Sequence, residues 1–396
     1  MKRPFRQAIP VWIFLVALAA GAGMVGCGSD ETTNPTPTPE TPGSISTWAG
    51  NDLVGFNRDG HPLTESSLYS PIDVTITSTG EAYILDWNNH RVRHVTAAGV
   101  LETVIGTSIP GDGPNDLSDL TEPGALGTTV NLNHPTNLLE LPSGKLLLTA
   151  WHNHKLRVYD PATQRVVVTC GRGPGFSGDG SAATSALLNQ PSASTLGLDG
   201  SIYTLDQINQ RVRKIAPDGT ITTVVGTGIR GFAGDGGAPL EAQLNLPPNP
   251  NPLPAGTVAV DAQGRLYISD TLNHRIRRVD FALNMIETVA GNGTAGFGGD
   301  GALATAASLN NPRDIEIGAD GRLYIADELN NRIRAVDLAL GTIETVAGTG
   351  VAGFGGDGAL AVNAMLNRPT GIEFDSDDHM YIADAYNHRI RRVYLP

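Results

Sequence analysis

Short runs of β-branched and apolar residues, separated by turn residues, recur along most of this chain. In one representative stretch the runs cover residues 314–317, 322–326, 331–336 and 342–346, and a Gly-Ala-Asp-Gly segment separates the first two. Runs of this length, bounded by Gly and Asp, are typical of β-strands joined by tight turns. The pattern therefore predicts an all-β protein whose structural unit holds four strands.

The four-run unit is repeated six times. A phrase of the type D-x-x-N-[HNQ]-[RK]-[VIL]-R occurs in each unit, and the residue after its Asn is at position 90, 154, 210, 274, 331 or 388. A second phrase, of the type G-F-x-G-D-G and ending in Pro, precedes each copy; its Pro is at 71, 135, 191, 247, 312 or 369. The second and fourth units carry insertions, at 114–127 and 248–255. Self-similarity at a fixed period predicts a repeat architecture.

The two ends of the repeat region complement each other. Residues 44–50, with the sequence SISTWAG, match the fourth run of a unit, and the last unit stops after three runs. Radial repetition of small sheets leaves few exposed strand edges, which favours a propeller over an open stack. We therefore predict a six-bladed β-propeller of four-stranded antiparallel blades, in which the N-terminal strand completes the last blade.

These phrases resemble those of the NHL-repeat propellers, and the resemblance covers residues 45–396. The units here are longer than is usual for that family because the segment around Gly-Asp-Gly is extended. Members of the family bind RNA, cleave peptide amides, act as sensor domains of bacterial kinases or mediate adhesion. The resemblance therefore implies the fold but does not settle the function.

The N-terminal segment has the features of a secretory signal. Lys2, Arg3 and Arg6 precede a charge-free stretch from 8 to 25, and residues 24–27 read Met-Val-Gly-Cys, with the cysteine at Cys27. This segment resembles a bacterial lipoprotein signal, which implies cleavage before Cys27 and lipidation of its sulfur; an uncleaved transmembrane anchor is the alternative. We expect a signal peptide at 1–26, a lipidated Thr/Pro-rich tether at 27–44 and the propeller at 45–396, held at the bacterial cell envelope, on the outer membrane or cell surface.

Composition narrows the class of partner. The net charge is −13 at pH 7, and it becomes −16 without residues 1–26, which hold three basic residues and no acid. A phosphate backbone is neutralised by Lys and Arg, so a nucleic-acid partner is not expected. The two cysteines cannot form a disulfide framework, and Cys170 is expected to be a buried, inert thiol.

The polar residues that recur in every unit are expected to support the fold. The repeated Asp (86, 206, 270, 327 and 384, replaced by Ala150 in the second unit) should pair with an Arg of the same blade, because a buried charge needs a partner. The His residues at 90, 154, 274 and 388 are better explained by turn chemistry than by metal ligation. The Gly-Asp-Gly loops are ordinary turns, with calcium loops as the alternative.

Candidate functional residues come from positions where the units differ. Two residues after each repeated Pro, at the mouth of the central channel, we expect Asp73, Asn137, Ala193, Thr257, Asp314 and Gly371, followed two residues later by Glu316 and Glu373. Asp73, Asn137, Asp314, Glu316 and Glu373 form a candidate binding set, which could hold a hard cation as in gluconolactonase-like propellers. The alternative, a solvated acidic lining, is the simpler interpretation. Arg313, Trp87 and Trp151 are further candidate contacts.

Two functions fit this sequence. The first is a non-enzymatic, surface-tethered binding module, monomeric and without a cofactor, that engages a protein, peptide or glycan with its loop-rich face. No G-x-S-x-G, H-E-x-x-H or C-x-x-C motif contradicts it. The second is a hydrolase or lyase that depends on one divalent cation, such as calcium, held by the acids at the channel mouth.

Overall fold

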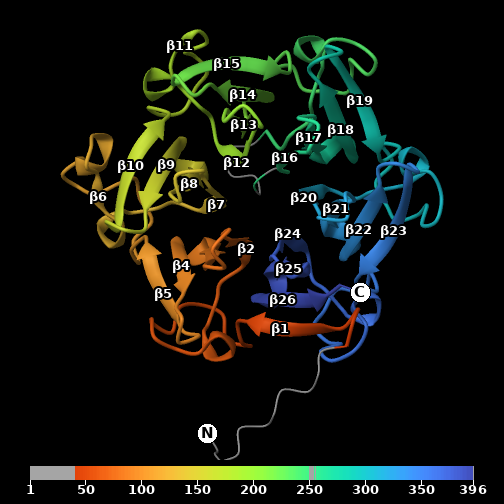
Figure 1. The fold of residues 1–396 in the computed structure, drawn as a ribbon, viewed down its shortest axis with the longest axis horizontal. Helices are drawn as coiled ribbons and strands as arrows, with labels where there is room; N and C mark the ends of the chain where they lie inside the picture. Colours follow the sequence, from red (N-terminus) through yellow and green to blue (C-terminus); the bar gives the residue numbers. More distant parts are fainter. Residues whose placement is uncertain (1–40, 249–253, 255, 396) are drawn as a thin grey trace, which may run out of the picture. The chain divides into compact units, whose positions relative to one another are not determined.

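The computed structural model describes residues 41–248, 254 and 256–395, which form six antiparallel β-sheets arranged as a ring around a central channel (Figure 1). The six sheets belong to one compact unit of the chain. The predicted six-bladed propeller is therefore confirmed. The predicted signal peptide, Cys27 and most of the 248–255 insertion lie outside the described residues.

Each blade has four strands, which we call a, b, c and d from the channel outward. The a strands are β2 (Pro71–Ile76), β7 (Pro135–Glu140), β12 (Pro191–Leu196), β16 (Val258–Val260), β20 (Pro312–Ile317) and β24 (Pro369–Phe374). The b strands are β3 (Ala82–Asp86), β8 (Leu146–Ala150), β13 (Ile202–Asp206), β17 (Leu266–Asp270), β21 (Leu323–Asp327) and β25 (His379–Asp384). The c strands are β4 (Arg91–Val95), β9 (Lys155–Asp160), β14 (Arg211–Ile215), β18 (Arg275–Asp280), β22 (Arg332–Asp337) and β26 (Arg389–Tyr394).

The d strands are β5 (Leu101–Ile105), β10 (Arg165–Cys170), β15 (Thr220–Val225), β19 (Met285–Ala290), β23 (Thr342–Ala347) and β1 (Ile45–Ala49). Two blades gain a short fifth strand outside d, β6 (Ala125–Leu126) or β11 (Ser181–Ala182). Single 3-10 turns follow five b strands: η2 (Trp87–Asn89), η5 (Trp151–Asn153), η8 (Thr271–Asn273), η10 (Glu328–Asn330) and η12 (Ala385–Asn387). Others lie in the segments between blades: η1 (Leu63–Glu65), η3 (Ser118–Leu120), η4 (Gly127–Thr129), η6 (Ala183–Ser185), η7 (Pro239–Glu241), η9 (Ala304–Ala306) and η11 (Ala361–Asn363).

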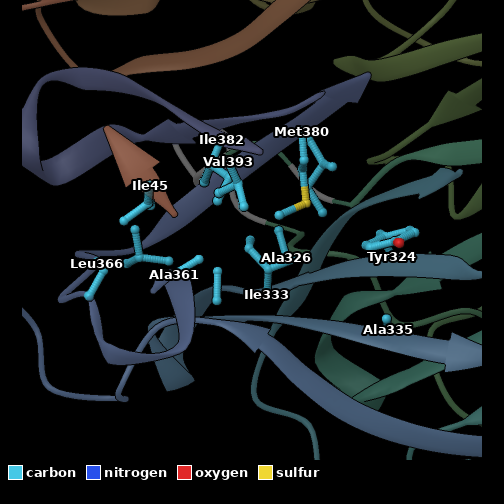
Figure 2. Packing of buried hydrophobic residues seen from close by; sticks show 13 residues of the cluster. Ile45, Tyr324, Ala326, Ile333, Ala335, Ala361, Leu366, Met380, Ile382 and Val393 are labelled. Atoms are coloured by element: carbon cyan, nitrogen blue, oxygen red, sulfur yellow. The ribbon is translucent and has the colours of Figure 1, made fainter. Parts of the chain in front are cut away.

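The ring closes as predicted. Strand β1 pairs antiparallel with β26, with Ile45 opposite Val393 and Ala49 opposite Ile390, so the sheet order is β1-β26-β25-β24. Figure 1 shows β1, at the red end of the sequence, beside the blue strands of the last blade. The apolar side chains of β1 and β26 pack with those of the neighbouring fifth blade, and Figure 2 shows Ile45, Val393 and Ile333 within one cluster.

The connections divide the propeller into two faces. The segments from each d strand to the next a strand, and the turns between b and c, lie on what we call the loop-rich face. The a–b and c–d turns lie on the opposite face, which we call the turn face. An a strand therefore starts at the loop-rich face and ends at the turn face. Among the described residues, no helix is long and apolar enough to cross a membrane.

A buried arginine joins three segments of each blade. In five blades it contacts the Asp that ends strand b, as Arg334 Nη1 contacts Asp327 Oδ2 at 3.3 Å, and all ten of these side chains are fully buried. Its other nitrogen contacts the Asp of the preceding Gly-Asp-Gly segment, as Arg334 Nη2 contacts Asp300 Oδ1 at 2.6 Å. Thr345 of strand d donates a hydrogen bond to the same Asp300 (2.7 Å). The predicted pairing within blades is confirmed, and these Asp-Gly loops are anchored by arginine.

The second blade keeps this arrangement with a different acid. Ala150 stands where the other blades have Asp, and Arg157 is fully buried. Its guanidinium contacts Asp112 at 2.5 Å and also Asp119, a buried residue contributed by the 114–127 insertion. An unpaired buried guanidinium would be strongly unfavourable. The insertion therefore supplies the carboxylate that the repeat has lost.

The residues that follow the repeated Asn join neighbouring blades. Each has a left-handed backbone, with φ between 52° and 56°, and its side chain accepts a hydrogen bond from the backbone N–H that precedes the next blade. The six bonds are His90 to His134, His154 to Gln190, Gln210 to Leu246, His274 to Asn311, Asn331 to Arg368 and His388 to Ser70. Asn and Gln supply the same acceptor as the unprotonated His Nδ1. The turn interpretation of these histidines therefore agrees with their geometry.

Candidate functional site in the central channel

The six a strands surround a cavity of about 210 Å³ inside the channel. Its lining runs from residues near the middle of the a strands to their ends at the turn face, and it includes all five candidate residues: Asp73, Asn137, Asp314, Glu316 and Glu373. They were expected at the mouth of the channel, and they line its interior instead. The reason is that strand a starts at the loop-rich face, so side chains two and four residues after the Pro lie below that mouth.

Asp73 and Asp314 lie at the inner end of the cavity and are 8% and 7% exposed. Asp314 accepts hydrogen bonds from the Thr257 hydroxyl (2.7 Å) and from the backbone N–H groups of Ile315 and Ile372 (2.9 and 2.6 Å). Asp73 has weaker partners, the Asn137 amide at 3.3 Å and the Leu138 N–H at 3.4 Å, besides its neighbour Val74 N–H at 2.9 Å.

Glu316 and Glu373 lie nearer the turn face and are partly exposed. Glu373 accepts a hydrogen bond from the Phe374 N–H (2.9 Å). The lining also holds a fifth carboxylate, Glu140, which was not predicted from the sequence. Its oxygens accept hydrogen bonds from the N–H (2.7 Å) and the hydroxyl (3.0 Å) of Ser78 in the first blade. Glu140 ends β7 and has no acidic counterpart in the other units, so the repeat pattern gave no signal for it.

Burial and neighbouring charge raise the pKa of four of these carboxyl groups. Burial raises the pKa of Asp314 to about 6, and burial with the charge of Asp314 raises that of Glu316 to about 8. Burial, followed by the charge of Asp314, raises the pKa of Asp73 well above its usual value; burial, followed by Glu316, does the same for Glu373. The described residues that line the cavity include no Lys or Arg. A positively charged or donor-rich group would therefore be stabilised here.

A single metal ion would require the ligand oxygens to converge. Asp73, Asn137 and Asp314 offer the oxygen ligands that hard cations prefer. A ready-made site would bring together at least three His, Cys, Asp or Glu side chains with their ligand atoms within 4.8 Å of one another. Among the described residues, the group that meets this spacing is Asp375, Asp377 and His379. The channel carboxylates do not meet that spacing, so they do not form a ready-made cage. In the Asp375 set, Asp375 already bonds to the His379 ring and caps the a–b turn.

The remaining sequence candidates lie at the loop-rich end of the channel. Trp151 is fully buried and its Nε1–H donates to Gln207 (3.0 Å), while the neighbouring Trp87 is partly exposed. Their ring centroids are 6.2 Å apart. Arg313 is 5% exposed and lines a small cavity of about 10 Å³, together with Asp73 and Asp314. The channel thus has a basic residue at one end and acidic residues along the rest.

The chain resembles several curated proteins over part of their length. It is 27% identical over 65% of its length to Protein SUPPRESSOR OF QUENCHING 1, chloroplastic, from Arabidopsis thaliana, and 26% identical over 71% to NHL repeat-containing protein 2 from Bos taurus. It is 26% identical over 89% of its length to teneurin-1 from Gallus gallus. The chain covers 24%, 40% and 14% of these three proteins, so their full activities lie beyond what it matches.

Solved structures and a family model point to the same fold. A Bacteroides thetaiotaomicron protein of unknown function has a TM-score of 0.64 at 18% identity, over 88% of this chain and 75% of its own. An auxiliary nutrient binding protein from Bacteroides ovatus has a TM-score of 0.60 at 16% identity, over 88% and 76%. The NHL-repeat model matches residues 68–95 and 366–393, which lie in the first and last blades. The chain therefore carries NHL repeats in its first and last blades, and its structure is a six-bladed β-propeller.

Proposed function

We propose that this protein is a non-enzymatic binding module, tethered at the cell envelope, whose ligand places a positively charged group in the acidic channel cavity. The observation that carries the proposal is a cavity lined by five carboxyl groups and, among the described residues, by no basic group. Ionised carboxylates that are desolvated together are unfavourable, and such clusters are typical of functional sites. Among protein, peptide and glycan ligands, this charge favours one that carries an ammonium group.

Two further observations support a binding role. The solved structures of similar fold include two described as auxiliary nutrient binding proteins, although at 15% and 16% identity the likeness concerns the fold. The proposed tether is supported by the N-terminal segment, in which a basic head and an apolar stretch precede Cys27. Labelling of intact cells with radioactive palmitate, comparing the parent chain with Cys27→Ser, tests the lipid anchor independently of ligand binding.

Paired ligands that differ in one charge test the binding role. We expect chitosan oligosaccharides, which carry free amines, to bind more tightly than the fully acetylated oligosaccharides of equal length, and peptides with free amines to bind more tightly than their acetylated forms. Binding should release protons, because a bound cation lowers the pKa of the neighbouring carboxyl groups. Calorimetry in two buffers of different ionisation enthalpy measures that release. Equal affinity within each pair, or binding without proton release, would contradict the proposal.

The oxygen ligands Asp73, Asn137 and Asp314 favour a second candidate, a hydrolase or lyase that depends on a divalent cation. Metal analysis of the purified protein, with its melting temperature before and after chelation, separates the two. One retained ion per chain and a chelator-sensitive melt favour the enzyme, because a ligand of the folded state raises its stability. In that case Asp73→Ala or Asp314→Ala should remove the ion and leave the fold intact.

A further inference from the structure

The guanidinium of Arg313 is buried without a hydrogen bond to any described residue. Its closest carboxylate is that of Glu328, and the two are 3.8 Å apart between Nη1 and Oε2. Both side chains are nearly inaccessible, at 6% and 4% exposed. A buried arginine normally uses its planar N–H donors on carboxylate or carbonyl oxygens, and donors left without a partner are costly. Arg313 therefore has donors that lack an acceptor among the described residues.

A second arginine stands on the other side of Glu328. Arg368 Nη1 is 3.9 Å from Glu328 Oε1, and that oxygen has no hydrogen-bond partner among the described residues. Arg368 also donates to the Tyr386 hydroxyl (3.3 Å), and its guanidinium lies 4.6 Å from the centre of the Tyr386 ring. Two guanidinium groups thus share one loosely held carboxylate, so these three side chains together carry one excess positive charge.

This group departs from the repeat at all three of its positions. Uncharged residues stand at each equivalent position of the other blades. For Arg313 they are Ile72, Thr136, Ser192, Gly256 and Thr370; for Glu328, Trp87, Trp151, Gln207, Thr271 and Ala385; for Arg368, Ser70, His134, Gln190, Leu246 and Asn311. The propeller fold therefore does not require charge here, in contrast to the arginine of strand c, which recurs in every blade.

The location connects this group to both the surface and the channel. Arg368 and Tyr386 are exposed on the loop-rich face, at 37% and 43%. Arg313 lines the cavity of about 10 Å³ at the loop-rich end of the channel, and a space of that size accommodates about one water-sized polar atom. An oxygen of a ligand that approached from this face would meet the free donors of Arg313.

We infer that Arg313 and Arg368 form a site for the carboxylate of a ligand that reaches the propeller from its loop-rich face. Glu328 holds the two guanidinium groups apart and competes with the incoming carboxylate. The planar fork of arginine matches a carboxylate, and charge-assisted hydrogen bonds of this type are stronger than neutral ones. The site adjoins the acidic cavity, because Asp73 and Asp314 line the same small cavity as Arg313. Its test uses a carboxylate and the function proposed above is tested with an ammonium group, so the two can fail separately.

A tripeptide pair tests the inference on the mature protein. The probe is acetyl-trialanine with a free C-terminal carboxylate, and its matched control is the same peptide as the amide. We expect the acid to shift the Arg313 Nε–H resonance of the ¹⁵N-labelled protein saturably, and the amide to leave it unchanged. If neither peptide moves that resonance, the inference is wrong. If inorganic phosphate binds and the peptide acid does not, the carboxylate assignment is wrong.

Three variants test which side chains the binding of the peptide acid depends on. Arg313→Met should weaken the acid about tenfold or more, the amount expected for a hydrogen bond to a charged group. Arg230→Met, the control, changes an exposed arginine on the same face and should leave the affinity unchanged. Glu328→Gln should tighten binding, because it removes the competing carboxylate; it also provides the test if Arg313→Met does not fold. Unchanged or weaker binding by Glu328→Gln would overturn the inference.

Discussion

The imidazole of His388, in the last blade, accepts a hydrogen bond at 3.0 Å from the backbone N–H of Ser70, just before the first blade. Five equivalent bonds join the other pairs of neighbouring blades, so the bond from Ser70 completes a ring of six. Because the bond requires an unprotonated Nδ1, it depends on the charge of the histidine.

His388→Ala should lower the free energy of unfolding by about 1 kcal/mol, the net contribution of one hydrogen bond. His388→Asn should have a smaller effect, because the chain already uses Asn331 at this position in the fifth blade. Urea titrations of the two variants and the parent measure the difference. Equal loss in both variants would show that the acceptor is not what stabilises this turn.

The same histidines should make the propeller sensitive to acid. Burial lowers the pKa of His90, His154, His274 and His388 below 6.5. Their contribution to stability is therefore complete above pH 6.5 and is lost as the pH falls toward the folded-state pKa, because the unfolded chain then binds more protons. Replacing all four by Asn should flatten the fall in unfolding free energy between pH 6.5 and pH 5. An unchanged profile would contradict this assignment.

Glu316 should have the opposite pH dependence. Its pKa is raised from 4.5 to about 8 by burial and by the charge of Asp314. Between these two values the folded protein retains a proton that the unfolded chain has lost, so stability falls as the pH rises from 4.5 through 8. Glu316→Gln should remove this part of the decline and should be more stable than the parent above pH 8. Melting temperatures across pH 5–9 test this, and Glu344→Gln, an exposed change in the same blade, is the control.

Within the 114–127 insertion, substitution of Asp119 should lower the free energy of unfolding the most. Asp119→Ala leaves the guanidinium of Arg157 with Asp112 alone, and breaking a buried ion pair in this way costs about 3–5 kcal/mol. Adding Ala150→Asp should recover part of that loss, because it restores the acid that the other blades use. Asp116→Ala, an exposed change in the same segment, should have little effect. A small loss for Asp119→Ala would show that the insertion does not support the blade.

Phe297 covers the two arginines of the fifth blade. The centre of its ring lies 3.8 Å from the guanidinium carbon of Arg332 and 4.9 Å from that of Arg334. Phe297→Leu keeps most of the apolar volume and removes the aromatic face, so it should cost about 1 kcal/mol of unfolding free energy. Leu340→Ala, at an exposed site of the same blade, is the control. Equal small losses in both variants would show that the ring contributes only apolar contact.

Most of the fold could be predicted from the sequence because the same four-strand pattern occurs in six successive units. The matching runs at 44–50 and 342–348 predicted the closing strand, and the four runs of the fifth unit lie within one or two residues of β20, β21, β22 and β23. The register after the repeated Pro also predicted four of the five carboxylates that share the channel, and it missed Glu140. Their role in binding stays a prediction.

What the sequence could not predict concerns residues outside the repeat. Asp119 replaces the missing acid of the second blade from a segment with no counterpart in the other units. Arg313 and Glu328 belong to different segments of the repeat unit. They come into contact because the start of strand a and the b–c turn both lie at the loop-rich end of the channel. The position of the acidic residues inside the channel, below its mouth, could not be predicted from the sequence either, because it depends on where strand a enters the ring.

The closing strand has a consequence for biosynthesis. Strand β1 is the first strand to be synthesised, and its partner β26 is the last described strand of the chain. Thr47 of β1 also binds Asp357, which in turn binds Arg391 of β26. During translation the first five blades can form in order, while β1 has no partner until the ribosome has delivered residues 389–394. The N-terminal strand must therefore wait as an unpaired edge, and the ring can close only after the last blade has been synthesised.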